Sequence, residues 1–228
     1  MSSMTGMGRI LFAEALGSAL LLAIVAGSGI MAEQLAAGNQ AQALLANSLA
    51  TGAGLFVLIM MFGPISGAHF NPAVSLVACL QREISVTTLA AYCAAQIGGA
   101  ISGVWATHLM FGLAVQQSSL KVRSGSNLWW AELIATFGLV LTIQSFSRRK
   151  LPLASCAAMV ALYIVAAYWF TASTSFANPA VTLARSLTNT FTGIRTADVA
   201  GFIVAQYAGA LCALACAKAL FEEQVPAK

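Results

Sequence analysis

The sequence predicts an all-α membrane protein with six transmembrane helices and two re-entrant half-helices in an inverted repeat. The first observation is composition: of 228 residues, 59% are hydrophobic and 8% are charged, against about 25% charged in soluble domains. Mean hydropathy is +0.84. The second observation is that the apolar runs are long and do not alternate in polarity, which indicates helices rather than a membrane β-barrel. The third is a six-residue motif that occurs twice.

Segments with few charged residues indicate where the membrane-spanning helices lie. At about 20 residues per crossing, six crossings need roughly 120 residues, so the length fits six helices with substantial connections. Glu14 interrupts the first segment, and the uncharged stretch 34–81 is longer than one crossing. Trp129 and Trp130 indicate an interfacial belt on the fourth helix, and Pro152 marks the start of the fifth. The expected helices span 8–31, 44–63, 86–111, 128–146, 153–171 and 197–221.

The basic residues predict the orientation in the membrane. If both chain ends lie on one side, seven basic residues fall on that side and four on the other, so the positive-inside rule predicts cytoplasmic N- and C-termini. The first set is Arg9, Arg82, Arg148, Arg149, Lys150, Lys218 and Lys228, and the second is Lys121, Arg123, Arg185 and Arg195.

Composition also excludes several functions. The net charge of +4 is spread along the chain, so no nucleic-acid partner is expected. The five cysteines lie in apolar runs without Cys-x-x-Cys spacing, which argues against a disulfide framework or a metal site. No nucleophile–base pair, paired Asp or metal cluster occurs in the spans. We therefore expect no catalytic residue, no cofactor and no enzyme activity.

Two remaining stretches, 64–80 and 172–190, are too short or too polar to span the membrane and too apolar for solvated loops. Both contain Asn-Pro-Ala-Val-Ser/Thr-Leu, beginning at Asn71 and at Asn178. The flanks repeat as well: an Ala-Glu pair at Glu14 and Glu132 precedes each motif, and Gln-x-x-Gly follows each. Because each half has three helices, the halves must insert in opposite orientations. The whole chain, 1–228, is thus expected to form a single membrane channel domain, with the first repeat at 8–111 and the second, inverted, at 128–221.

The motif itself predicts a broken helix. Asn caps helices and Pro is favoured at the first helical position, so we expect half-helices over 73–80 and 180–187. Their positive N-terminal ends would meet at the midplane and oppose protons and cations. The amides of the two Asn residues can donate to a passing neutral solute, and carbonyls of 65–70 and 173–177 would supply acceptors. The pore residues predicted from the two motifs are Asn71, Pro72, Ala73, Asn178, Pro179 and Ala180.

Three other polar residues have candidate roles. Glu14 and Glu132 are expected to accept hydrogen bonds from the re-entrant loops, with proton coupling as the alternative. His69, just before the first motif, is expected beside the cytoplasmic pore mouth. Its role is either pore lining or gating, or packing alone.

The paired motifs, the paired Glu and the paired Gln-x-x-Gly resemble the major intrinsic protein family, the aquaporins and aquaglyceroporins, over nearly the whole chain. The resemblance implies six helices plus two half-helices, a homotetramer in the lipid bilayer and one pore per subunit.

The family's selectivity filter is built from four positions, which ungapped counting from the motifs places at Thr51, Ala166, Ser175 and Val181. Most members have Arg directly after the second Asn-Pro-Ala, where this chain has Val181. All four residues are small, and none is aromatic or charged, which predicts a wider and less polar opening.

The run from Asn178 to Leu187 resembles a bacterial subgroup associated with arsenic-resistance loci. This likeness implies efflux of arsenous acid, a neutral trihydroxide of polyol size, across a bacterial inner membrane. Arg185 lies one turn beyond Val181 on nearly the same face. It is a candidate to line the outer vestibule and attract oxyanions or methylated arsenicals. Alternatively, it snorkels or ties the loop to backbone carbonyls.

Together these features predict a passive channel for small neutral solutes: water, glycerol-like polyols and arsenous acid. The alternatives are a coupled secondary transporter with inverted repeats and a strict water channel. A junction protein that transports nothing is a further possibility.

Overall fold

The computed structural model describes residues 6–149 and 151–221, and every regular element in these ranges is helical. Lys150 and Lys228, which enter the charge count above, lie outside them. Six helices are long and apolar enough to cross a membrane within the described ranges, which confirms the predicted fold class. In chain order the elements are α1 (Gly6–Leu35), α2 (Gln40–Ser66), α3 (Pro72–Leu80), α4 (Val86–Met110), α5 (Ser126–Arg149), α6 (Leu153–Phe170), α7 (Pro179–Arg185), a 3-10 turn η1 (Thr196–Asp198) and α8 (Val199–Leu220).

The element ends differ from the expected ones where local hydrogen bonds decide them. The second helix begins at Gln40, four residues before the expected start, because the Asn39 side chain accepts from the Gln42 N–H. The second half-helix ends at Arg185 rather than at 187. There the N–H groups of Ser186 and Leu187 bond back only three residues, which tightens the last turn and ends the α-helix.

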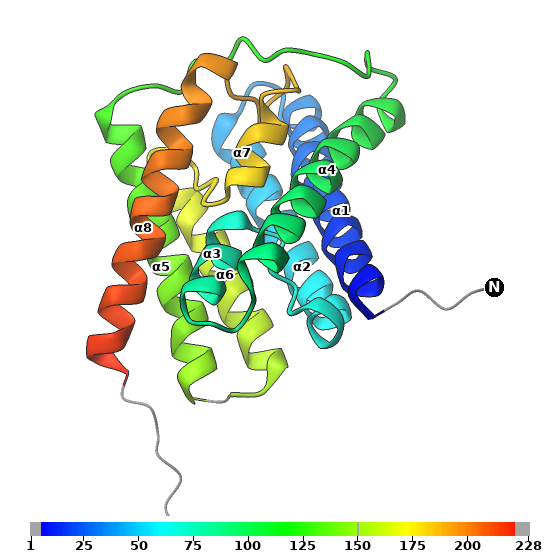
Figure 1. The fold of residues 1–228 in the computed structure, drawn as a ribbon. Helices are drawn as coiled ribbons and strands as arrows, with labels where there is room; N and C mark the ends of the chain where they lie inside the picture. Colours follow the sequence, from blue (N-terminus) through cyan, green and yellow to red (C-terminus); the bar gives the residue numbers. More distant parts are fainter. Residues whose placement is uncertain (1–5, 150, 222–228) are drawn as a thin grey trace, which may run out of the picture.

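The helices form a bundle in which the two halves use the same contacts (Figure 1). α1 packs on α2 and α4, and α5 packs correspondingly on α6 and α8, while α2 meets α6. The short helices α3 and α7 each contact both α4 and α8, so both half-helices are wedged between the two halves. The first residues of α1 and the last residues of α8 both lie in the lower half of the view. We call this face the α3 side, and the opposite face, with the connections 111–125 and 186–195, the α7 side.

Close packing of α1 on α4 depends on glycine. A Cβ at Gly99 or Gly103 would collide with the backbone of Ala15 or Ala19 in α1. Gly209 of α8 is equally close to the α5 backbone at Leu133. Association of membrane helices relies on such van der Waals contact, since lipid tails are as apolar as side chains.

This packing predicts different effects at two neighbouring glycines. Gly99→Ala should lower the free energy of unfolding by about 1–3 kcal/mol, because the added methyl group overpacks the α1–α4 contact. Gly98→Ala is the matched control, because a Cβ there meets no atom within 4 Å. Thermal unfolding of the purified protein in detergent measures both. Equal stability of the two variants would contradict the packing described here.

Candidate functional site

The two Asn-Pro-Ala motifs begin the half-helices as the sequence predicts. The Asn71 Oδ1 atom accepts the Ala73 N–H at 2.9 Å. The Asn178 Oδ1 atom accepts the N–H groups of Ala180 at 3.0 Å and Val181 at 3.3 Å. Pro occupies the first turn of both helices, where its missing N–H costs nothing. Each side chain therefore satisfies donors that the helix leaves open.

The same two side chains also join the half-helices. Asn71 Nδ2 donates to the Ala177 carbonyl and Asn178 Nδ2 donates to the Phe70 carbonyl, both at 2.8 Å. Each amide thus bonds the loop that leads into the other half-helix, and the two N-termini are held together inside the bundle. An Asn amide has two N–H groups, so one on each residue remains for a solute.

The loops before the motifs have strained backbones. Ala68, Phe70, Thr174, Ser175 and Ala177 all have φ between 47° and 61°, a left-handed conformation that costs non-glycine residues roughly 1–2 kcal/mol each. Alternation of this conformation with ordinary residues turns successive N–H groups toward one point, which makes a concave anion site. A buried carboxylate fills each of these two sites.

Glu14 fills the first. Its Oε1 atom accepts the His69 N–H at 3.0 Å and the Ser66 hydroxyl at 2.6 Å. Its Oε2 atom accepts the Phe70 N–H and the Gln96 amide, both at 2.8 Å. The side chain is 0% exposed, so these bonds replace water completely.

Glu132 makes the equivalent contacts in the second half. It accepts the N–H groups of Phe176 and Ala177 at 2.8 Å each, and the Gln206 amide at 2.6 Å. Gln206 in turn donates to Thr182 Oγ1 at 2.8 Å. Both carboxylates thus have the contacts expected of loop supports, and neither borders the cavity described next.

One cavity of about 340 Å³ runs along the bundle past the crossed half-helices. Its wall reaches from Gln81 and Gln144 on the α3 side to Arg185 on the α7 side. Most of the wall is aliphatic. Asn71 and Asn178 both line it, so the polar amides lie where the pathway passes the helix N-termini.

Three of the four expected filter residues line this cavity: Thr51, Ser175 and Val181. Ala166 does not, and the structure corrects its assignment. Ala166 is exposed on the outer face of α6, whereas Ile164 and Tyr168 line the cavity. At 100° per residue, a position two places from each of these points away from them.

Tyr168 therefore occupies the wall where the count placed Ala166. Its hydroxyl lies 3.2 Å from Thr51 Oγ1. With Phe176 and Arg185 also on the wall, the cavity near Val181 contains aromatic and charged groups. The position after the second motif does lack Arg, and the wider, less polar opening expected from the four filter residues stays a prediction.

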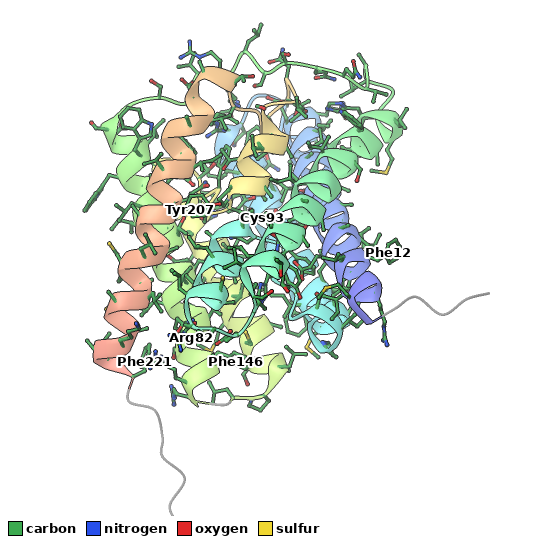
Figure 2. The ribbon with its side chains drawn as sticks, viewed as in Figure 1. Phe12, Arg82, Cys93, Phe146, Tyr207 and Phe221 are labelled. Carbon is green, nitrogen blue, oxygen red and sulfur yellow. The ribbon has the colours of Figure 1, made fainter. Side chains whose placement is uncertain are left out.

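His69 lines the cavity on the α3 side and is also packed. Its Nδ1 atom is 3.0 Å from Ser75 Oγ, and its ring is edge-on to Tyr92 with centroids 5.2 Å apart. Figure 2 shows Arg82 and Phe146 toward the same end of the bundle, and Phe146 borders the cavity there.

Arg185 both lines the cavity and bonds a backbone carbonyl, whereas attraction of oxyanions stays a prediction. It is 3% exposed, its Nε donates to the Thr192 carbonyl, and it lines the cavity. Its guanidinium lies 3.3 Å from the centroid of the Phe176 ring. Arg123 lies over the same ring at 5.1 Å, a contact that the sequence did not indicate. Among the described residues, no group of three His, Cys, Asp or Glu side chains is placed to hold a metal ion.

Comparisons with known proteins agree with this architecture. Residues 1–175 match the family model of the major intrinsic proteins. Aquaglyceroporin AqpS of Rhizobium meliloti (strain 1021) is 54% identical over 217 residues, which covers 94% of this chain and 91% of that protein. Human aquaporin-2 is 34% identical over 139 residues, covering 60% of this chain and 48% of that protein. The X-ray structure of the aquaglyceroporin from Plasmodium falciparum superposes with a TM-score of 0.73 over 95% of this chain and 96% of its own, at 20% identity, which shows a shared fold.

The buried carboxylates give a stability prediction. Glu132→Gln should lower the free energy of unfolding by about 2–3 kcal/mol, because an amide NH₂ would face loop donors that need an acceptor. Glu33→Gln is the control, since Glu33 is exposed on α1. Thermal unfolding in detergent measures both variants, and an unchanged midpoint for Glu132→Gln would contradict the support role.

Cys156 gives a test of the pathway, because it borders the cavity whereas the other cysteines of the described chain do not. Attachment of a small methanethiosulfonate should obstruct the cavity and remove most solute flux from proteoliposomes. Cys156→Ser should conduct and resist the reagent. Equal inhibition of the Ser variant would place the pathway elsewhere.

Proposed function

The chain belongs to the major intrinsic protein family, and from this premise we propose that it is an aquaglyceroporin that conducts water, glycerol-like polyols and arsenous acid passively across a membrane. The observation on which the proposal rests is the cavity with Asn71 and Asn178 at the crossing of the half-helices. Both N-terminal helix ends lie there, and their partial positive charge opposes cations and protons. A neutral hydroxylated solute instead receives hydrogen bonds from the free amide N–H groups.

The α7 part of the cavity determines how large a solute the pathway admits. Val181 leaves room that an Arg would fill, and the largely aliphatic wall suits solutes with carbon skeletons. The similarity to an aquaglyceroporin over 94% of the chain supports polyols. Arsenous acid has three hydroxyl groups, is neutral near pH 7 and is close to a polyol in size, so the same pathway accommodates it. Efflux of this solute is the proposed physiological role.

The membrane arrangement is part of the proposal. The chain is an integral membrane protein, and we place the α3 side, with both ends of the described chain, in the cytoplasm of a bacterium. Arg82, Arg148 and Arg149 lie on that side and agree with the positive-inside rule. The outer helix faces expose large apolar side chains such as Leu109 and Val204. Lipid and the neighbouring subunits of a homotetramer would cover them.

A coupled transporter is the less favoured alternative. Ion coupling needs a site for the ion near the midplane, and the carboxylates there, Glu14 and Glu132, are occupied by loop donors. Glu83 is the acidic residue on the cavity wall in the described chain, and it lies beyond the end of α3.

Val181 gives the direct test. Val181→Arg should lower glycerol flux about tenfold, equivalent to about 1.4 kcal/mol of added barrier, because the side chain narrows the pathway and adds charge. Val181→Leu, which adds bulk without charge, should lower it less. Stopped-flow light scattering on proteoliposomes with water, glycerol and arsenous acid gradients measures all three proteins.

The other outcomes of that experiment identify the alternatives. Water flux alone, unchanged in Val181→Arg, would show a strict water channel with its constriction elsewhere. Solute flux that saturates and follows an ion gradient would show a coupled transporter. No flux of any solute would favour a junction role.

A further inference from the structure

At the α7 end of the cavity, two guanidinium groups without a carboxylate partner among the described residues lie over the Phe176 ring: that of Arg185, which lines the cavity, and that of Arg123, which does not. The ion pair of the described chain joins Arg195 and Asp198 at 2.8 Å. Neither Arg123 nor Arg185 forms one with a described residue. Asp198 uses its second oxygen for the Arg123 backbone N–H, not for its guanidinium.

Both side chains are anchored by neutral groups instead. Arg123 Nε donates to the Gly193 carbonyl at 2.8 Å and Nη1 to the Ser173 carbonyl at 3.2 Å. Arg185 Nε donates to the Thr192 carbonyl. These bonds fix the positions of the guanidiniums but leave their charges uncompensated, and buried charge without a partner is costly.

The nearby carboxylate of Glu132 does not neutralise the charge of the two guanidiniums. Glu132 acts electrostatically on both guanidiniums, but its oxygens already accept two backbone N–H groups and an amide. One negative charge therefore faces two positive ones, and the N-terminal end of α7 adds a partial positive charge. The local field favours an anion.

Donors are also available at this point. The two Nη atoms of Arg185 have no hydrogen-bond partner among the described residues, and Arg185 lines the cavity. Ser175 is 4% exposed, lines the same wall, and its Oγ has no partner. A guanidinium presents its N–H groups as a planar fork, which matches two oxygens of a planar anion.

We propose that the α7 end of the cavity is a binding site for a small, planar, monovalent oxyanion, bound by Arg185 Nη and Ser175 Oγ. Arg123 positions the site by holding Phe176, on which the Arg185 guanidinium rests. Since the site lies on the solute pathway, the bound anion reduces the flux of neutral solutes. This last consequence rests on the proposed function, whereas binding itself does not.

The probe is nitrate, added to the purified full-length protein and followed by titration calorimetry. The wild type should bind nitrate, and Arg185→Met should lose binding. Arg185→Lys keeps the charge without the fork and should bind more weakly. Ser175→Ala leaves both arginine anchors intact and should also weaken binding. Arg82→Gln removes an exposed charge on the α3 side and should bind like the wild type.

Flux then tests the consequence. Nitrate should lower glycerol flux into wild-type proteoliposomes in a saturable way, whereas gluconate at equal concentration should not, and Arg185→Met should abolish the nitrate effect. Absence of binding to the wild type, or equal binding by Arg185→Met and the wild type, would overturn the site. Nitrate binding without any glycerol flux would instead contradict the proposed function and leave the site standing.

Discussion

The structure depends on two buried carboxylates that hold strained loops. The backbone before each half-helix adopts left-handed conformations that non-glycine residues avoid, and its N–H groups would be orphaned inside the membrane. Glu14 and Glu132 supply the acceptors. Irregular backbone at membrane depth is tolerated only where it is buried in protein or lines a water-filled cavity. Burying the two carboxylates costs free energy, but their hydrogen bonds to the loops allow the half-helices to begin inside the membrane.

The crossed amide bonds follow from that support. Once the loops are fixed, each Asn can cap its own half-helix and bond the opposite loop at 2.8 Å. The pathway then passes two positive helix ends and two amides, between aliphatic walls. This combination offers hydrogen bonds to a neutral solute and electrostatic opposition to a cation. In the proposed channel, selection rests on backbone dipoles and amides, because neither buried carboxylate of the described chain, Glu14 or Glu132, lines the cavity at the crossing.

The parts of this design that repeat could be predicted from the sequence. The Asn-Pro-Ala motif, the Glu before it and the Gln after it each occur in both halves of the chain. This duplication indicates that the two copies of each residue have the same role. Ala166 was assigned to the cavity wall by counting back from Asn178. This count assumes a constant rise per residue across 171–178, whereas the backbone of that segment is irregular and strained. Arg123 and Tyr168 have no repeat partner. Arg123 comes from the irregular connection 111–125, and only three-dimensional folding brings it over Phe176.

The central claim is passive conduction of neutral solutes through the cavity, and the initial rate of glycerol entry into wild-type proteoliposomes tests it most directly. The rate is measured against the glycerol gradient, with and without proton and sodium gradients. A channel predicts a rate that rises linearly with the glycerol gradient and ignores both ion gradients. A rate that saturates and rises with either ion gradient would contradict the account.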